Sequence, residues 1–322
     1  MSPSIRSERK YLEILRILAE SHEPQGAKRL SEKMAERGFV LSDRAVQYYL
    51  QYLDEAGFTE KVGNRGRILT EAGIAESESA LVDERIGFII SRLEQLAFRS
   101  TFDPATGTGS IAYNLSIVRE EDLDGVTAAF GEVAAAGYGF LNTYRIVDSD
   151  PRIPDGHVGI MTACSVTLDG VLQKMGIPAR LEYAGRIAVD ENGSAGFLDL
   201  IGYRGTSVDP LHLFISAGLT SIHRLVTTRA GVGLANVRAV PAPARDQVEE
   251  ATALMGEWGF VFPAGGSIGE FNLPKHPYRL SVVAFSGMNM VGSAIEKGYV
   301  IRTEIGAGII TFERIADATG SR

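Results

Sequence analysis

The 322-residue sequence contains a single cysteine, Cys164, and no apolar run near the ~20 residues that a membrane-spanning helix requires. One cysteine excludes an internal disulfide and a thiolate-rich metal site. The amino terminus, MSPSIRSERK, lacks the apolar stretch of a signal peptide, so we expect a cytoplasmic protein. The histidines show no metal-ligand spacing, and the sequence therefore predicts no metal and no cofactor; they are His22, His157, His212, His223 and His276.

Positive charge is also scarce, and only the amino-terminal segment carries an excess of it. The net charge is -8. Residues 1–70 hold 12 Lys and Arg against 10 Asp and Glu, a balance of +2, whereas the remainder holds 20 against 30, a balance of -10. Because neutralised phosphates supply most nucleic-acid affinity, only the amino-terminal segment is a candidate for binding a polyanion.

Residues 1–75 are predicted to form a winged helix-turn-helix domain. Apolar residues at helical spacing from Tyr11 to Leu18 indicate a first helix, and residues 27–37 a second. Ser42 is a good N-cap for a third helix. Residues 58–62 and 67–70 then flank the turn Gly63–Gly66, which predicts a two-stranded wing.

The third helix has an apolar stripe and a polar outer face. In this domain type the third helix enters the major groove, where Arg and Gln form paired hydrogen bonds with base edges, and the wing lies over the phosphates or the minor groove. We therefore expect contacts with double-stranded operator DNA. The alternative is a helical module that docks protein and leaves this face solvated. The predicted DNA-binding residues are Ser42, Arg44, Gln47, Tyr48, Arg65 and Arg67.

Residues 76–100 are predicted to form a linker helix, with an apolar stripe from Ile86 to Ala97. This stripe could contribute to dimerisation. An equally open alternative is that the helix packs on its own domain.

Residues 101–322 contain an internal repeat, with halves at 101–195 and 208–318. When the sequence is shifted by 122 positions, so that Asn114 meets Asn236, 13 of 74 aligned positions are identical. Each half is expected to run strand, helix, strand, strand, helix, strand, and its helices end at glycine. That order predicts an α+β protein whose regulatory region consists of two homologous ferredoxin-like, split βαβ halves.

The turn before the second helix of each half is a candidate effector-binding site, because a helix amino terminus offers free N–H groups to an anion. The alternative is that these polar residues only cap the helices. Glycine turns allow close backbone approach and form a second set of candidates. An arginine such as Arg145, Arg180 or Arg302 could assist. The predicted effector-binding residues are Thr162, Cys164, Ser165, Thr167, Ser286, Gly287, Asn289, Gly205, Thr206 and Ser207.

Enzyme motifs are poor. Residues 265–269 fit G-x-S-x-G, but a nucleophile elbow must lead into a helix, and Asn272-Leu273-Pro274 follows here. The glycines around Thr108 have the letters of a dinucleotide loop, but a strand follows where a helix is required. The sequence therefore predicts a protein that is not an enzyme.

Four features together resemble the NrpR family of nitrogen-regulatory transcriptional repressors. They are the winged helix with LSDRAVQYYLQYLDEAGF, the stretch TACSVTLDGVLQKMGIP, the phrase GYRGTSVDPLHLFI and the duplicated carboxyl half. The resemblance implies a homodimeric repressor of nitrogen-assimilation genes that 2-oxoglutarate releases from its operator, with a PII-type signalling protein as a further partner. Some members carry two regulatory domains, whereas we expect a single region of two halves here. The competing interpretation is a metabolite-binding scaffold or enzyme whose winged helix docks protein.

Overall fold

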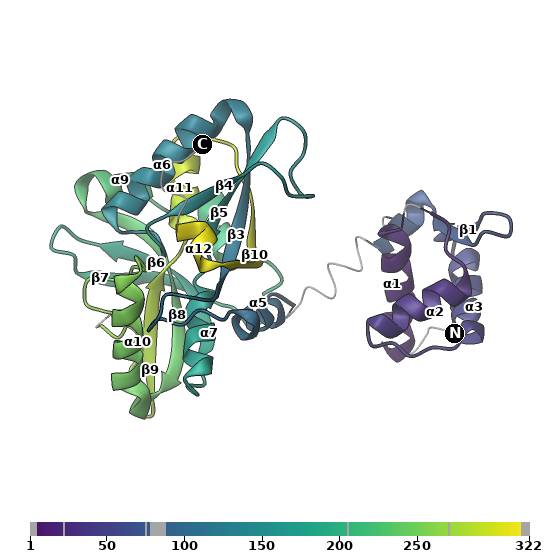
Figure 1. Cartoon of the computed structure of the whole chain (residues 1–322), viewed down its shortest axis with the longest axis horizontal. Helices are drawn as coiled ribbons and strands as arrows, with labels where there is room; N and C mark the ends of the chain where they lie inside the picture. Colours follow the sequence, from purple (N-terminus) through teal and green to yellow (C-terminus); the bar gives the residue numbers. More distant parts are fainter. Residues whose placement is uncertain are drawn as a thin grey trace. The chain divides into compact units, whose positions relative to one another are not determined.

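The computed structural model describes residues 5–21, 23–74, 76–77, 88–204, 206–269 and 271–316. The chain divides into two compact units, Met1–Ile86 and Gly87–Arg322, and each is described by itself (Figure 1). Within the described residues, no helix combines the length and the apolarity needed to cross a bilayer.

The amino-terminal unit has the predicted winged-helix order. Helices α1 (Ile5–Ala19), α2 (Ala27–Glu36) and α3 (Asp43–Glu55) precede the antiparallel strands β1 (Thr59–Lys61) and β2 (Arg67–Leu69). The three helices bury one apolar core, which holds Ile14, Leu15, Ile17, Leu18, Leu30, Met34, Val46, Leu50 and Leu53. Ser42 caps α3 as predicted, because its hydroxyl accepts the Ala45 N–H at 3.3 Å.

The predicted linker helix is described only in part. Residues 78–87 lie outside the described residues, and α5 spans Phe88–Arg99. Leu93, Leu96 and Ala97 of α5 are buried in a core of the second unit. This part of the helix therefore packs on the regulatory region, as the alternative interpretation expected.

The regulatory unit contains two four-stranded antiparallel sheets. The strand order is β10-β3-β5-β4 in the first sheet and β7-β6-β8-β9 in the second. The strands are β3 (Ser110–Arg119), β4 (Tyr144–Val147), β5 (His157–Ala163), β6 (Arg180–Val189), β7 (Ala195–Gly202), β8 (Gly231–Pro241), β9 (Arg279–Phe285) and β10 (Arg302–Thr311). The helices are α6 (Leu123–Ala136), α7 (Val166–Lys174), α8 (Pro210–Ser216), α9 (Ile222–Thr228), α10 (Arg245–Glu257), α11 (Met288–Glu296) and α12 (Phe312–Ala316).

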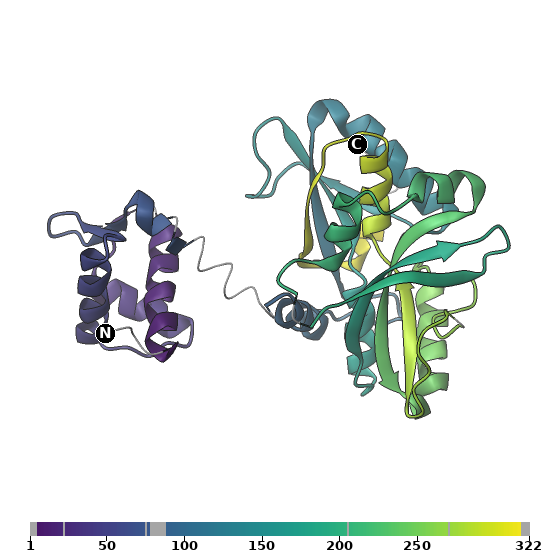
Figure 2. The same cartoon turned by 180° about the vertical axis from the view of Figure 1, so that it is seen from behind.

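The two halves exchange their last helix and strand. The last strand of the first half, β6, pairs with β8 of the second half, and β10 pairs with β3 of the first. The second helices are exchanged as well. Helix α11 of the second half shares a core with α6 and with Ala112 and Val118 of the first half, whereas α7 of the first half shares a core with α10 and with Val240 and Val282 of the second. Figures 1 and 2 show α10 along β9, far from α6. The split βαβ order is therefore confirmed in the first half, whereas the described residues of the second half lack its second strand, and each sheet is completed by the other half.

Two further features distinguish the halves. The first half has the edge strand β4, whereas the matching residues 266–269 lie in turns. Residues between the two aligned stretches, 114–187 and 236–309, form β7, α8 and α9, and β7 extends the second sheet beyond β6. The predicted glycine ends of α6 and α10 are confirmed, because Gly137 and Gly259 have φ of 76° and 86°.

Candidate functional site

The outer face of α3 is exposed as predicted. Arg44, Gln47 and Tyr48 face solvent, and the Tyr48 side chain is 70% exposed. The opposite side of the helix buries Val46 and Leu50 completely. Because the apolar stripe packs the helix into the domain, the face with Arg44, Gln47 and Tyr48 is free to contact another molecule.

The two wing arginines differ in their surroundings. Arg65 is exposed in the turn between β1 and β2. Arg67 places its Nε 2.8 Å from a carboxylate oxygen of Asp54 on α3, and Thr59 donates its hydroxyl to the same carboxylate at 2.6 Å. Arg67 therefore ties the wing to the helix, and Arg65 is the wing arginine that faces solvent.

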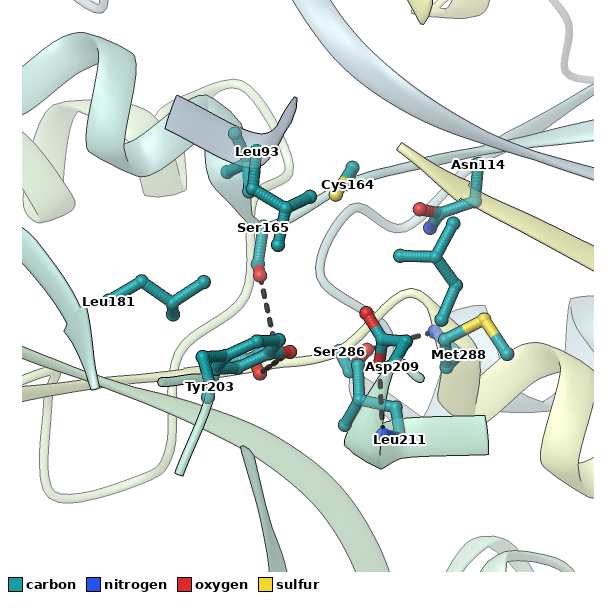
Figure 3. A pocket seen from close by; sticks show the side chains of 13 residues that line it. Leu93, Asn114, Cys164, Ser165, Leu181, Tyr203, Asp209, Leu211, Ser286 and Met288 are labelled. Atoms are coloured by element: carbon teal, nitrogen blue, oxygen red, sulfur yellow. Dashed lines mark hydrogen bonds between the residues drawn. The ribbon is translucent and has the colours of Figure 1, made fainter. Parts of the chain in front are cut away.

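The candidate effector site is a small cavity between the two halves of the regulatory unit (Figure 3). The cavity volume is about 10 Å³, which leaves room for about one water molecule. Matched positions of the repeat meet at its wall. The lining residues are Leu93, Asn114, Cys164, Ser165, Val166, Leu181, Tyr203, Asp209, Leu211, Asn236, Ser286, Met288 and Ile305.

Cys164 and Ser286 lie where the chain leaves one sheet for the other. Their N–H groups donate to equivalent carbonyls, Ala112 for Cys164 at 2.8 Å and Leu234 for Ser286 at 3.0 Å. Both side chains line the cavity, as does Ser165. Burial raises the pKa of the Cys164 thiol to about 11, so the thiol stays neutral at physiological pH.

Thr167 and Asn289 have a structural task instead. The Thr167 hydroxyl accepts the Ala112 N–H at 3.0 Å, and the Asn289 side-chain oxygen accepts the Leu234 N–H at 2.7 Å. These matched bonds fasten the second helix of each half to the first strand of that half. Neither side chain lines the cavity, and neither α7 nor α11 has a side-chain cap hydrogen bond, so these two residues act on the strands and their role in effector contact stays a prediction.

Two asparagines at matched positions join the halves. Asn114 accepts the N–H of Gly306 on β10 at 3.1 Å and lies 3.3 Å from the Thr162 hydroxyl, to which it donates. Asn236 donates to the Ser165 hydroxyl at 2.8 Å. Gly287 packs against Asn114, and a side chain at position 287 would collide with the carbonyl of Ala163. The sequence repeat contained this signal, because Asn114 and Asn236 are among its identical pairs.

A fully buried ion pair lies behind Ser165. Arg238 on β8 places its Nε 2.8 Å from the Asp169 carboxylate on α7 and donates through Nη2 to the Ser165 carbonyl at 2.6 Å. Its side chain is 0% exposed. Nothing in the sequence pattern indicated this pair, because the repeat mates of Arg238 and Asp169 are Ser116 and Val291.

The glycine turn that follows β7 reaches the cavity only through the residues on either side of it. Gly205 lies outside the described residues, and the Thr206 hydroxyl donates to the carbonyl of Tyr203 at 3.1 Å. Neither Thr206 nor Ser207 lines the cavity, whereas Tyr203 and Asp209 do. The segment named by the sequence therefore reaches the cavity through Tyr203 and Asp209, and the role of Thr206 and Ser207 stays a prediction.

Asp209 is the charged group of the cavity. It is 7% exposed, and its carboxylate caps α8 by accepting the Leu211 N–H at 2.9 Å. Burial raises its pKa to about 6. The described residues of the lining include no Lys, Arg or His, so the predicted arginines Arg145, Arg180 and Arg302 do not reach this site.

Comparisons with known proteins agree with this architecture. Residues 86–317 match the family model of NrpR regulatory domains NRD1 and 2, and residues 12–76 match a ribonuclease R winged-helix domain model. A nitrogen repressor-like protein from Methanococcus jannaschii has a similar fold, with a TM-score of 0.58, 21% identity and coverage of 70% of this chain and 96% of that one.

Two curated relatives extend the match. The global nitrogen regulator NrpRI of Methanosarcina mazei is 37% identical over 312 residues, 94% of this chain and 95% of the relative. The global nitrogen regulator NrpR of Methanococcus maripaludis is 30% identical over 89% of this chain, which spans about half (51%) of that protein.

A winged helix joined to NrpR-type regulatory domains defines a two-module regulator. The chain belongs to the NrpR family. Because its relatives are regulators, the expectation that the protein is not an enzyme is confirmed.

Proposed function

We propose that this chain is a transcriptional repressor of nitrogen-assimilation genes that binds operator DNA as a homodimer and releases it when 2-oxoglutarate binds. The observation that carries the proposal is the position of Leu93. This residue of α5, the first described helix of the regulatory unit, forms part of the cavity wall. A ligand in the cavity would therefore act directly on the element nearest in sequence to the winged helix.

Effector binding requires the cavity to open. 2-Oxoglutarate is far larger than the one water molecule for which the cavity has room. Entry must therefore displace groups that line the cavity, among them Asn114 and Asn236 with their hydrogen bonds. A ligand shifts such an equilibrium only by binding the opened arrangement better than the closed one. Displacement of α5 would then change the spacing of the two recognition helices in a dimer, and operator affinity would fall.

DNA contact is assigned to the exposed faces of α3 and the wing. Replacing Arg44 or Gln47 with alanine is expected to relax base preference and to weaken operator binding by ~1 to 3 kcal/mol, because each variant removes a pair of hydrogen bonds to a base edge. Arg65→Ala is expected to weaken binding to all sequences about equally and to reduce the salt dependence of the affinity, because it removes a phosphate contact. Electrophoretic mobility shifts on specific and scrambled operators measure both effects.

The competing class, a scaffold whose winged helix docks protein, makes the opposite prediction. Mobility shifts with the promoter of a nitrogen-assimilation gene, with and without 2-oxoglutarate, separate the two. No shift with DNA would favour the scaffold, and a shift that 2-oxoglutarate leaves unchanged would exclude this effector. Light scattering at micromolar concentration tests the dimer. A pull-down with a PII-type protein tests the remaining partner that the family resemblance implies.

A further inference from the structure

The cavity places a carboxylate where a dicarboxylate effector is proposed to bind. One oxygen of Asp209 accepts the Leu211 N–H, and Figure 3 shows the other directed toward the middle of the labelled side chains. Polar groups that share the lining with Asp209 include two neutral hydroxyls, that of Tyr203, which donates to Asn236 at 2.9 Å, and that of Ser286. An ionised Asp209 would repel an incoming carboxylate in these buried surroundings.

No described cation compensates this repulsion at close range. Arg92 on α5 is the cation that acts on Asp209, but it is engaged by the Ile305 carbonyl and lies 3.5 Å from Glu304. His212 on α8 has a pKa lowered by burial, so its ring is neutral at neutral pH. The other titratable groups that face this region are Cys164 before α7, Tyr203 after β7, and the Arg238–Asp169 pair of β8 and α7.

We infer that Asp209 enters the effector complex as a neutral carboxylic acid and donates a hydrogen bond to one carboxylate of the effector. Each bound effector then brings one proton from solvent to Asp209. In this state Asp209 has one O–H donor, and a carboxylate of the effector accepts a stronger, charge-assisted hydrogen bond from it than a neutral acceptor would. The inference rests on the proposed function, since it concerns how 2-oxoglutarate binds at that same site.

The affinity of the protein for 2-oxoglutarate should therefore depend on pH. The pKa of Asp209 in the free protein is about 6, so most molecules carry the charge at pH 8 and must take up a proton to bind. The affinity for 2-oxoglutarate is therefore expected to fall about tenfold for each pH unit above about 6. Below pH 6 the acid is already protonated, and the dependence should flatten.

Isothermal titration with 2-oxoglutarate in two buffers of different ionisation enthalpy tests the inference on the wild-type protein. The expected result is uptake of close to one proton per ligand at pH 8, and much less at pH 5.5. Binding at pH 8 without proton uptake would overturn the inference and leave the proposed effector intact. Failure to bind at any pH would overturn both.

Asp209→Asn provides a second test, because asparagine keeps the oxygen that caps α8 and adds an amide donor. This variant is expected to bind with an affinity that is independent of pH from 6 to 8 and with no proton uptake. Asp246→Asn is the matched control, since Asp246 is an exposed carboxylate in the first turn of α10 and should retain the wild-type slope. A wild-type slope in Asp209→Asn would contradict the inference.

Discussion

The two halves of the regulatory unit share a backbone plan and differ in the polar side chains where they cross. Asn114 and Asn236 are identical and both bridge the halves, but Asn114 bonds to a main-chain N–H and Asn236 to a hydroxyl. Cys164 on one side faces Ser286 on the other. The two halves therefore share the asparagines that bond one half to the other, while the polar groups around the cavity differ between them. The cavity is therefore lined by different polar groups on its two sides.

The largest expected effect concerns the buried pair Arg238–Asp169, which joins the two halves and has no counterpart at the matched positions Ser116 and Val291. Arg238→Met leaves Asp169 buried without its partner, which typically costs ~3 to 5 kcal/mol of unfolding free energy. Ser116→Ala, at the matched position, loses one hydrogen bond to Thr303 and should cost only ~1 kcal/mol. Urea denaturation measures both.

The double variant Arg238→Met with Asp169→Val distinguishes charge from packing. Valine is the residue at the matched position 291. If the uncompensated charge causes the loss, the double variant should regain most of the stability. A double variant as unstable as the single one would show that Arg238 acts mainly by filling space.

The next effect concerns Asn289 and Thr167, which occupy matched positions and bond to the first strand of each half. Asn289→Ala removes bonds to both main-chain groups of Leu234 and to the Tyr138 carbonyl, and should cost ~2 to 3 kcal/mol. Thr167→Val removes the bond to Ala112 at nearly constant volume and should cost ~1 kcal/mol. Thermal unfolding compares the two. Equal losses would mean that the halves are fastened equally.

A smaller effect on stability, with a large one on ligand binding, is expected at the cavity itself. Cys164→Leu and Ser286→Leu add bulk to a nearly closed space, at ~1 to 3 kcal/mol. Both variants should still bind operator but should lose release by 2-oxoglutarate. Titration calorimetry reports the binding, with unfolding as the control for the fold. Wild-type affinity in both would move the effector site away from this crossing.

The sequence predicted the helices and strands better than it predicted which strands pair with one another. Hydrophobic spacing and helix-ending glycines located the repeat and most of its strands and helices, because these signals are local, but they missed β7, α8 and α9. It did not predict that β6 completes the sheet of β8, since residues 180–187 and 302–309 have nearly the same pattern and either fits either sheet. Cys164 and Ser286 were found from a turn before a helix, whereas Arg238 and Asp209 gave no signal because their role depends on contacts across the fold.

The smallest perturbation uses the only cysteine of the chain as a probe of the closed cavity. Cys164 is 5% exposed, and burial raises its thiol pKa to about 11 from the ordinary 9.0. Thiolate is the reactive form, so alkylation at pH 8 should be about 100-fold slower than in the urea-unfolded chain, and the rate should rise with pH. The Cys164→Ser, Ser286→Cys variant moves the thiol to the matched position, which is equally buried, and should be protected to a similar degree. Iodoacetamide labelling followed by mass spectrometry measures both rates. Fast labelling at position 286 alone would mean that the cavity opens from the side of the second half.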